Sequence, residues 1–221
     1  MSQLPKLGTR LLAHWQIKLF GITGFITVFF VVYFALLRFP VFPTTLMPVT
    51  WLDRAVPFHP IALTVYFSLW LYVSLPPSLA WSRQQLIAQG LTATIMGLVG
   101  FVIFFFWPTA APAAAALDPA DVQALAWLKQ VDAAGNACPS LHVAFAVHGA
   151  IWLDRVLREM RLHVALQLVN VVWCIAITYS TLATKQHVLV DVVAGALLGA
   201  VAGFCGTRSS RAPVLTPYAV K

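Results

Sequence analysis

The stretch from His187 to Gly206 reads HVLVDVVAGALLGAVAGFCG and indicates a helix that spans a membrane. A helix needs about 20 mostly apolar residues to cross a bilayer, which is the length of this stretch. Its one charged residue, Asp191, has apolar neighbours on both sides. A carboxylate inside a membrane is costly, so it requires a partner and marks a candidate functional site.

A partner for Asp191 is present in the same stretch. His187 lies four residues earlier, which is one turn away on the same face of a helix. A carboxylate that accepts a hydrogen bond from one imidazole nitrogen leaves the other nitrogen free as a nucleophile or a base. The alternative interpretation is a structural His–Asp pair that only locks the helix in place.

Glycines continue the same spacing of four after Asp191, at Gly195, Gly199 and Gly203. Small residues at this spacing let a second helix approach closely. We therefore expect the face with His187 and Asp191 to point into a helix bundle rather than toward lipid.

The composition of the whole chain agrees with a membrane protein. Of 221 residues, 60% are hydrophobic and 10% are charged, so the bilayer has to act as part of the solvent. The net charge of +7 is better explained by topology signals and anionic lipids than by nucleic acid, because no basic stripe lies on a polar segment. Three scattered cysteines give neither a disulfide framework nor a metal-binding spacing.

The sequence predicts an all-α integral membrane protein, a single bundle of six transmembrane helices over residues 1–221. Lipid-exposed loops are excluded from the hydrocarbon, so each apolar stretch is expected to be a helix. The expected spans are 19–37, 60–81, 86–107, 140–153, 162–180 and 187–206. The N-terminal stretch has no cleavage pattern after it, so we interpret it as a retained anchor.

The distribution of basic residues predicts the orientation. With six spans, the side that holds both termini carries ten Lys and Arg residues and the other side four. Basic residues favour the cytoplasmic side, so the termini are expected there. The four on the outer side are Arg38, Arg54, Lys129 and Lys185. A compact chain of this kind fits a bacterial inner membrane, with the site on the periplasmic side.

The third loop contains an expected helix start, with Asp118 at the N-cap and Pro119 at the first helical position. Apolar residues follow at near-helical spacing up to Leu128. We expect a short helix on the outer membrane surface, with a solvated helix as the alternative.

A second motif, Asn136-Ala-Cys-Pro139-Ser140-Leu-His142, opens the fourth span from the outer side. The free backbone N–H groups and the positive dipole end of a helix start suit a phosphate. Because His187 opens the sixth span from the same side, the two imidazoles are expected at the same depth in the membrane.

These motifs resemble the type 2 phosphatidic acid phosphatase superfamily. The resemblance is carried by Pro139-Ser140-Leu-His142 and by His187-x-x-x-Asp191-Val-x-x-Gly195. The residues from Ser180 to His187, Asp132-x-x-x-Asn136 and the upstream Leu52-Asp53-Arg54 are similar to the branch that includes inositol phosphorylceramide synthases.

The resemblance implies a role for each matching residue. His187 would attack phosphorus, Asp191 would orient His187, and His142 would act as general acid and base. Ser140 would bind the phosphate. Such enzymes use no metal or other cofactor, so protein donors must neutralise the transferring group.

The first block of the superfamily, a Lys followed by Arg-Pro, is absent, and Thr181 stands where the third block usually has Arg. Lys185 and Arg54, both on the expected outer side, are the candidate substitutes for binding the phosphate.

Four functions are compatible with these residues. The leading one is a lipid phosphatase at the outer leaflet, whose partners are a lipid phosphate and the surrounding membrane lipids. The second is a phosphotransferase that moves a phospho-headgroup to a lipid alcohol. A proton-coupled transporter could use an intramembrane His–Asp relay. A zinc site built from His142, His187 and Asp191 is the fourth.

Overall fold

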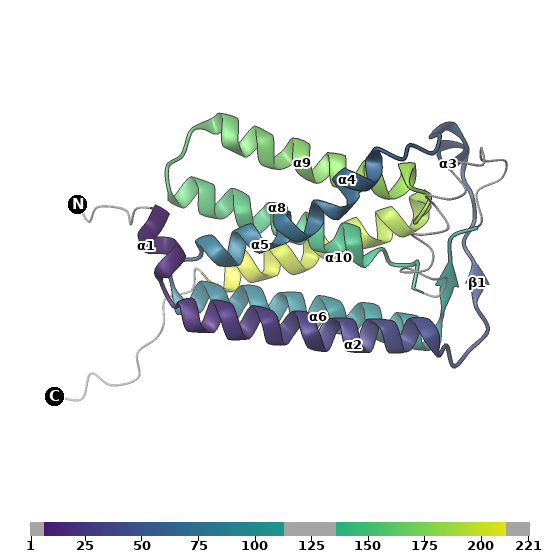
Figure 1. Ribbon diagram of the computed structural model, residues 1–221, viewed down its shortest axis with the longest axis horizontal. Helices are drawn as coiled ribbons and strands as arrows, with labels where there is room; N and C mark the ends of the chain where they lie inside the picture. Colours follow the sequence, from purple (N-terminus) through teal and green to yellow (C-terminus); the bar gives the residue numbers. More distant parts are fainter. Residues whose placement is uncertain (1–6, 113–135, 211–221) are drawn as a thin grey trace.

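The computed structural model describes residues 7–112 and 136–210, which are mostly helical (Figure 1). The helices are α1 (Leu7–Leu12), the π-helical turn η1 (Ile17–Gly21), α2 (Ile22–Arg38), α3 (Trp51–Ala55), α4 (Ala62–Phe67), α5 (Leu69–Leu79), α6 (Arg83–Phe106), α8 (Leu141–Glu159), α9 (Val164–Ala183) and α10 (Leu189–Ser209). The helix expected at 118–128 lies outside the described residues.

Five segments of the described chain are long and apolar enough to cross a membrane, so this is a multi-pass membrane protein. They are Ile17–Arg38, Ala62–Leu79, Arg83–Phe106, Val164–Ala183 and Leu189–Ser209. Each coincides with an expected span to within a few residues. The second is divided at Ser68, where α4 ends and α5 begins.

The segment expected at 140–153 forms α8, which extends further, to Glu159. Its last turns carry Asp154, Arg155 and Arg158, so it is more charged than the other five. These charges are paired one turn apart on the helix, Arg155 with Glu159 at 2.8 Å and Arg158 with Asp154 at 2.7 Å. Six transmembrane helices therefore stay a prediction, with five supported by length and composition.

The glycines of α10 bring it into close contact with α8, as the spacing predicted. A Cβ added at Gly195 would overlap the carbonyl oxygen of Ser140, and one added at Gly199 would overlap that of Ala144. A Cβ at Gly203 would lie 2.8 Å from Cδ1 of Ile151. Asp191, on the same face, is completely buried. The prediction that this face points into the bundle is confirmed.

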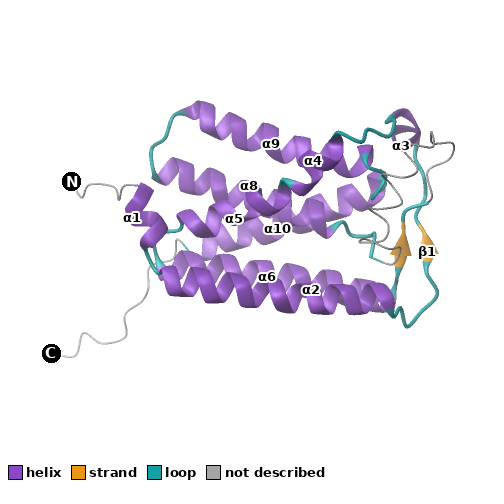
Figure 2. Cartoon of the chain, viewed as in Figure 1, coloured by secondary structure: helices purple, strands orange, loops and turns teal. Residues whose placement is uncertain are grey.

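Two short parallel strands, β1 (Thr45–Leu46) and β2 (Thr109–Ala110), join the loops after α2 and α6 (Figure 2). An isolated bridge from Thr109 to Asn136 connects the same structure to the segment before α8. Helix α1 lies at the opposite end of the bundle (Figure 1). We refer to these as the β1 end and the α1 end.

Candidate active site

His187 and Asp191 lie at the β1 end, where α10 begins. The imidazole Nδ1 of His187 is 3.6 Å from Oδ2 of Asp191, and both side chains are buried. This distance is slightly longer than a hydrogen bond, and such contacts between catalytic groups often tighten only when substrate binds. With Nδ1 turned to the carboxylate, Nε2 is the nitrogen left to react.

Asp191 also organises the start of α10. Its Oδ2 accepts a hydrogen bond from the backbone N–H of Val188 at 3.0 Å. Its backbone carbonyl accepts one from the N–H of Ser140 at 3.0 Å. The start of α8 is therefore attached directly to the turn of α10 that carries the carboxylate.

Ser140 is the N-cap of α8 and is completely buried. Its hydroxyl accepts a hydrogen bond from the N–H of Val143 at 3.3 Å. The N–H groups of Leu141 and His142 have no acceptor among residues 7–112 and 136–210. The Ser140 hydroxyl, which was predicted to bind phosphate, thus caps the start of α8 in this structure. The N–H groups of Leu141 and His142 remain beside it as hydrogen-bond donors.

His142 is held by Tyr66 of α4. The two rings are stacked with centroids 3.9 Å apart, and Nε2 of His142 lies 3.1 Å from the Tyr66 carbonyl oxygen. A carbonyl only accepts hydrogen bonds, so Nε2 carries a proton in this arrangement. Nδ1 of His142 is then the nitrogen that can take up and release a second proton.

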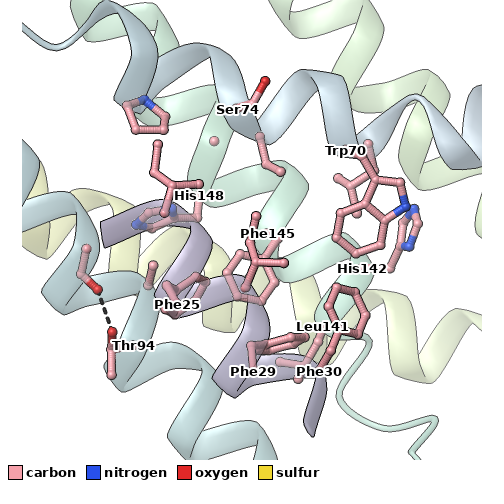
Figure 3. Close-up of a pocket in the computed structure, with 18 of the residues that line it drawn as sticks. Phe25, Phe29, Phe30, Trp70, Ser74, Thr94, Leu141, His142, Phe145 and His148 are labelled. Atoms are coloured by element: carbon pink, nitrogen blue, oxygen red, sulfur yellow. Dashed lines mark hydrogen bonds between the residues drawn. The ribbon is translucent and has the colours of Figure 1, made fainter. Parts of the chain in front are cut away.

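Both histidines line one large cavity of about 710 Å³ between α2, α4, α5, α6 and α8. Most of its lining is apolar, with aromatic side chains from α2 and α8. Figure 3 shows Phe25, Phe29, Phe30 and Phe145 gathered in it, with His142 nearby. The cavity has the size and the apolar lining typical of ligand sites.

Asp53 lies on α3, within the long loop between α2 and α4, and connects to the turn that carries His187. Its Oδ1 accepts a hydrogen bond from the N–H of Leu189 at 2.7 Å. Its Oδ2 accepts from both the N–H and the hydroxyl of Thr50 at 2.7 Å, which completes a capping box on α3. The N–H of His59 in the same loop donates to the Ala183 carbonyl at 3.0 Å. This loop therefore holds the segment between α9 and α10 in place.

Lys185 lies in that segment and also contacts the loop. Its Nζ donates to the carbonyl of Asp53 at 2.8 Å and to the carbonyl of Val56. Its backbone φ is 57°, a left-handed conformation that ends α9. Burial lowers the pKa of the Lys185 ammonium, and the nearby Asp53 partly offsets this. Arg54, the other predicted phosphate ligand, is exposed on α3.

Sequence reasoning gave no role to Tyr66 or Arg38, and it quoted Asp53 and Asn136 only for the family resemblance. Asn136 is buried and lines the cavity, and its Oδ1 has no hydrogen-bond partner within the described parts of the chain. Arg38 ends α2 with its guanidinium carbon 5.8 Å from the centre of Phe34, a cavity residue. The structural link through Asp53 had a further signal in the sequence, because Asp53 follows Thr50 at the spacing of a capping box.

Cys138 lies beside Asp191 just before α8. Burial raises the pKa of its thiol to about 11, and the Asp191 carboxylate raises it in the same direction. The group is therefore a neutral thiol at physiological pH and a weak donor next to the carboxylate.

The described parts of the chain contain no cluster of three His, Cys, Asp or Glu side chains that would hold a metal ion. His142, His187 and Asp191 are thus not arranged as three ligands of one zinc ion.

Comparison with known proteins gave one match. A family model described as the PAP2 superfamily matches residues 85–212, which is more than half of the chain and covers α8, α9, α10 and α6 from Gln85 onward. No curated protein and no solved structure matches the chain.

Proposed function

Because the chain belongs to the PAP2 superfamily, whose members act on lipid phosphates, we propose that it is a lipid phosphatase working through a phosphohistidine. The observation that carries the proposal is the buried His187–Asp191 pair at the end of an apolar cavity that His142 also lines. An apolar tail can occupy such a cavity while its phosphate reaches both histidines.

In the first step, Nε2 of His187 attacks phosphorus and the bond from phosphorus to the lipid oxygen breaks. Asp191 holds Nδ1–H of His187 and stabilises the positive charge that develops on the imidazole. Protonated His142 gives its proton to the departing lipid oxygen, which leaves as an alcohol. The geometry of the Tyr66 contact supports Nδ1 of His142 as the donor.

In the second step, neutral His142 removes a proton from water, whose oxygen attacks phosphorus and breaks the bond to His187. Free phosphate leaves, and both histidines return to their starting states. No metal or other cofactor takes part in this scheme.

The phosphate carries negative charge that must be balanced by donors from the protein. We propose Ser140, Lys185 and Arg54 for this role, together with the backbone N–H groups at the start of α8. Lys185 would exchange its bonds to the carbonyls of Asp53 and Val56 for bonds to the phosphate. Arg38, beside a cavity residue, is a further cation at this end.

A phosphotransferase of the inositol phosphorylceramide synthase kind is the second candidate. Two observations favour it: the cavity next to the histidines is apolar, and the buried Oδ1 of Asn136 has no partner in the described chain. That oxygen can accept a hydrogen bond from the hydroxyl of an acceptor lipid, which would then replace water in the second step.

One experiment separates the two candidates. Purified protein is incubated with lipid phosphates, with and without a ceramide or diacylglycerol acceptor and with and without EDTA, and free phosphate and new lipid are both measured. The phosphatase proposal expects free phosphate that is insensitive to EDTA and absent in His187→Ala. A new phospholipid that forms only with the acceptor would show that the protein is a transferase instead. If neither free phosphate nor new lipid appears, both proposals are wrong.

For the orientation, we propose that the termini face the cytoplasm and that the β1 end faces outward, as in a bacterial inner membrane with a periplasmic site. The basic residues of the two sides support this arrangement. A fluorescent protein fused to the C-terminus, which folds only in the cytoplasm, should fluoresce in cells. If the fusion is expressed and inserted but does not fluoresce, the C-terminus lies outside and the orientation is the opposite one.

A further inference from the structure

We infer that the cavity holds the hydrocarbon tail of the substrate, which extends from the two histidines past the middle of the membrane as far as Gly90. This inference rests on the proposed function and names its substrate class, a lipid phosphate with a long hydrocarbon tail. Gly90 is then the residue that sets the accepted tail length.

The length of the cavity supports a long chain. Along η1 and α2, cavity residues extend from Ile17 to Phe34, which corresponds to about 25 Å at the rise of a helix. One leaflet contributes only about 15 Å of the roughly 30 Å hydrocarbon thickness. A tail that enters at the histidines and fills the cavity would therefore pass well beyond its own leaflet.

The α1 end of the cavity carries two buried polar side chains. Lys18 and Gln89 both line it and are more than nine-tenths buried. The ammonium of Lys18 is already bonded to two carbonyls, of Arg10 at 2.5 Å and of Ser78 at 2.7 Å. Contact with these polar groups does not stabilise an apolar tail, so the end of the tail should lie before them.

Gly90 lines the cavity just before this polar end. It is exposed, and a Cβ added there would meet nothing within 4 Å. A Cβ at Gly97, two turns further along α6, would contact the Phe29 ring at 3.5 Å. Helices α2 and α6 run in the same direction (Figure 1), so this contact places Gly90, seven residues before Gly97, about level with Ile22. A large side chain at Gly90 that turns into the cavity would shorten it by about a third.

A photocrosslinking experiment tests where the tail lies. Wild-type protein in liposomes binds a long-chain alkyl phosphonate that carries a diazirine at the tail end, and the crosslinked residues are mapped by mass spectrometry. We expect crosslinks around Leu86–Ala93 of α6 and Ile17–Ile22 of α2. In Gly90→Phe they should move toward Phe145 and Leu141, whereas Gly24→Phe, on the exposed side of α2 where a Cβ also meets nothing, should leave them in place.

A turnover experiment with alkyl phosphates from octyl to docosyl tests the effect on specificity. We expect Gly90→Phe to lower kcat/KM for the longest chains on the order of tenfold and to leave the shortest chains unchanged. Gly24→Phe should match wild type for every chain.

Two results would overturn the inference. One is crosslinking only to lipid-facing residues such as Val28 and Val31; the other is the same crosslinks and length profile in Gly90→Phe as in wild type. If the crosslinks follow the expectation but wild type releases no phosphate, the cavity assignment stands and the proposed function fails.

Discussion

Replacing Gly195 with alanine should damage both the stability and the activity of this protein. The added methyl group would overlap the carbonyl oxygen of Ser140, which is backbone and cannot rotate away. The start of α8 must then move relative to α10. The hydrogen bond from Ser140 N–H to the Asp191 carbonyl, now 3.0 Å long, joins the two displaced segments.

The expected size of the effect follows from these contacts. Overpacking a close contact costs about 1–3 kcal/mol, and alanine returns about 1 kcal/mol through its better helix propensity. We therefore expect a net loss of up to about 2 kcal/mol in unfolding free energy. Because misplacing catalytic groups by 1 Å can lower turnover by about 100-fold, kcat should fall by a factor between about 10 and 100.

Thermal unfolding in detergent and phosphate release from a lipid phosphate measure the two effects. Gly24→Ala is the matched control, because its Cβ meets nothing within 4 Å and it should be slightly stabilising with unchanged turnover. A Gly195→Ala protein as stable and as active as wild type would show that α8 and α10 are not in this close contact.

Three further predictions concern residues around His187. Asp53→Asn should lower kcat about tenfold with little change in KM, because it weakens the hydrogen bonds from Asp53 to the backbone of Leu189 and Thr50. A change in KM alone would show that Asp53 does not position the turn that carries His187. Burial lowers the pKa of Lys185, so its positive charge, which would bind phosphate, should be lost as pH rises, at a lower pH than for an ordinary lysine. Lys185→Arg should therefore shift the alkaline fall of kcat/KM to higher pH. If that fall stays at the same pH, Lys185 does not bind the phosphate. Cys138, with a thiol pKa of about 11, should resist iodoacetamide at neutral pH when followed by mass spectrometry, and rapid labelling there would show that it is exposed or ionised.

The helices themselves were predictable from the sequence because membrane spans are long, apolar and obligatorily helical. The five supported spans match their predicted ranges closely, and the glycine spacing correctly identified the buried face of α10. The length of α8 was underestimated because Asp154 and Arg158 were taken as the start of a loop, whereas they pair with each other along the helix.

The elements of the site that the sequence did not reveal depend on contacts between distant segments. The stacking of Tyr66 on His142 joins residues 76 positions apart, and the bond from Lys185 to the Asp53 carbonyl joins residues 132 apart. No local pattern encodes such pairings. The bonds of Lys185 to the loop carbonyls were likewise not foreseen, since the charge alone suggested a phosphate ligand.

The central claim is that phosphorus becomes bonded to His187, and trapping that intermediate tests it most directly. A lipid phosphate radiolabelled at phosphorus is mixed with wild-type protein and, in parallel, with His142→Ala protein, in which both steps should be slow, and each reaction is quenched in alkali at a series of times and digested. The account predicts acid-labile, alkali-stable label on the peptide that contains His187, and no label in His187→Gln. Label on another residue, or turnover of the wild type at a normal rate with no labelled protein at any time, would contradict it.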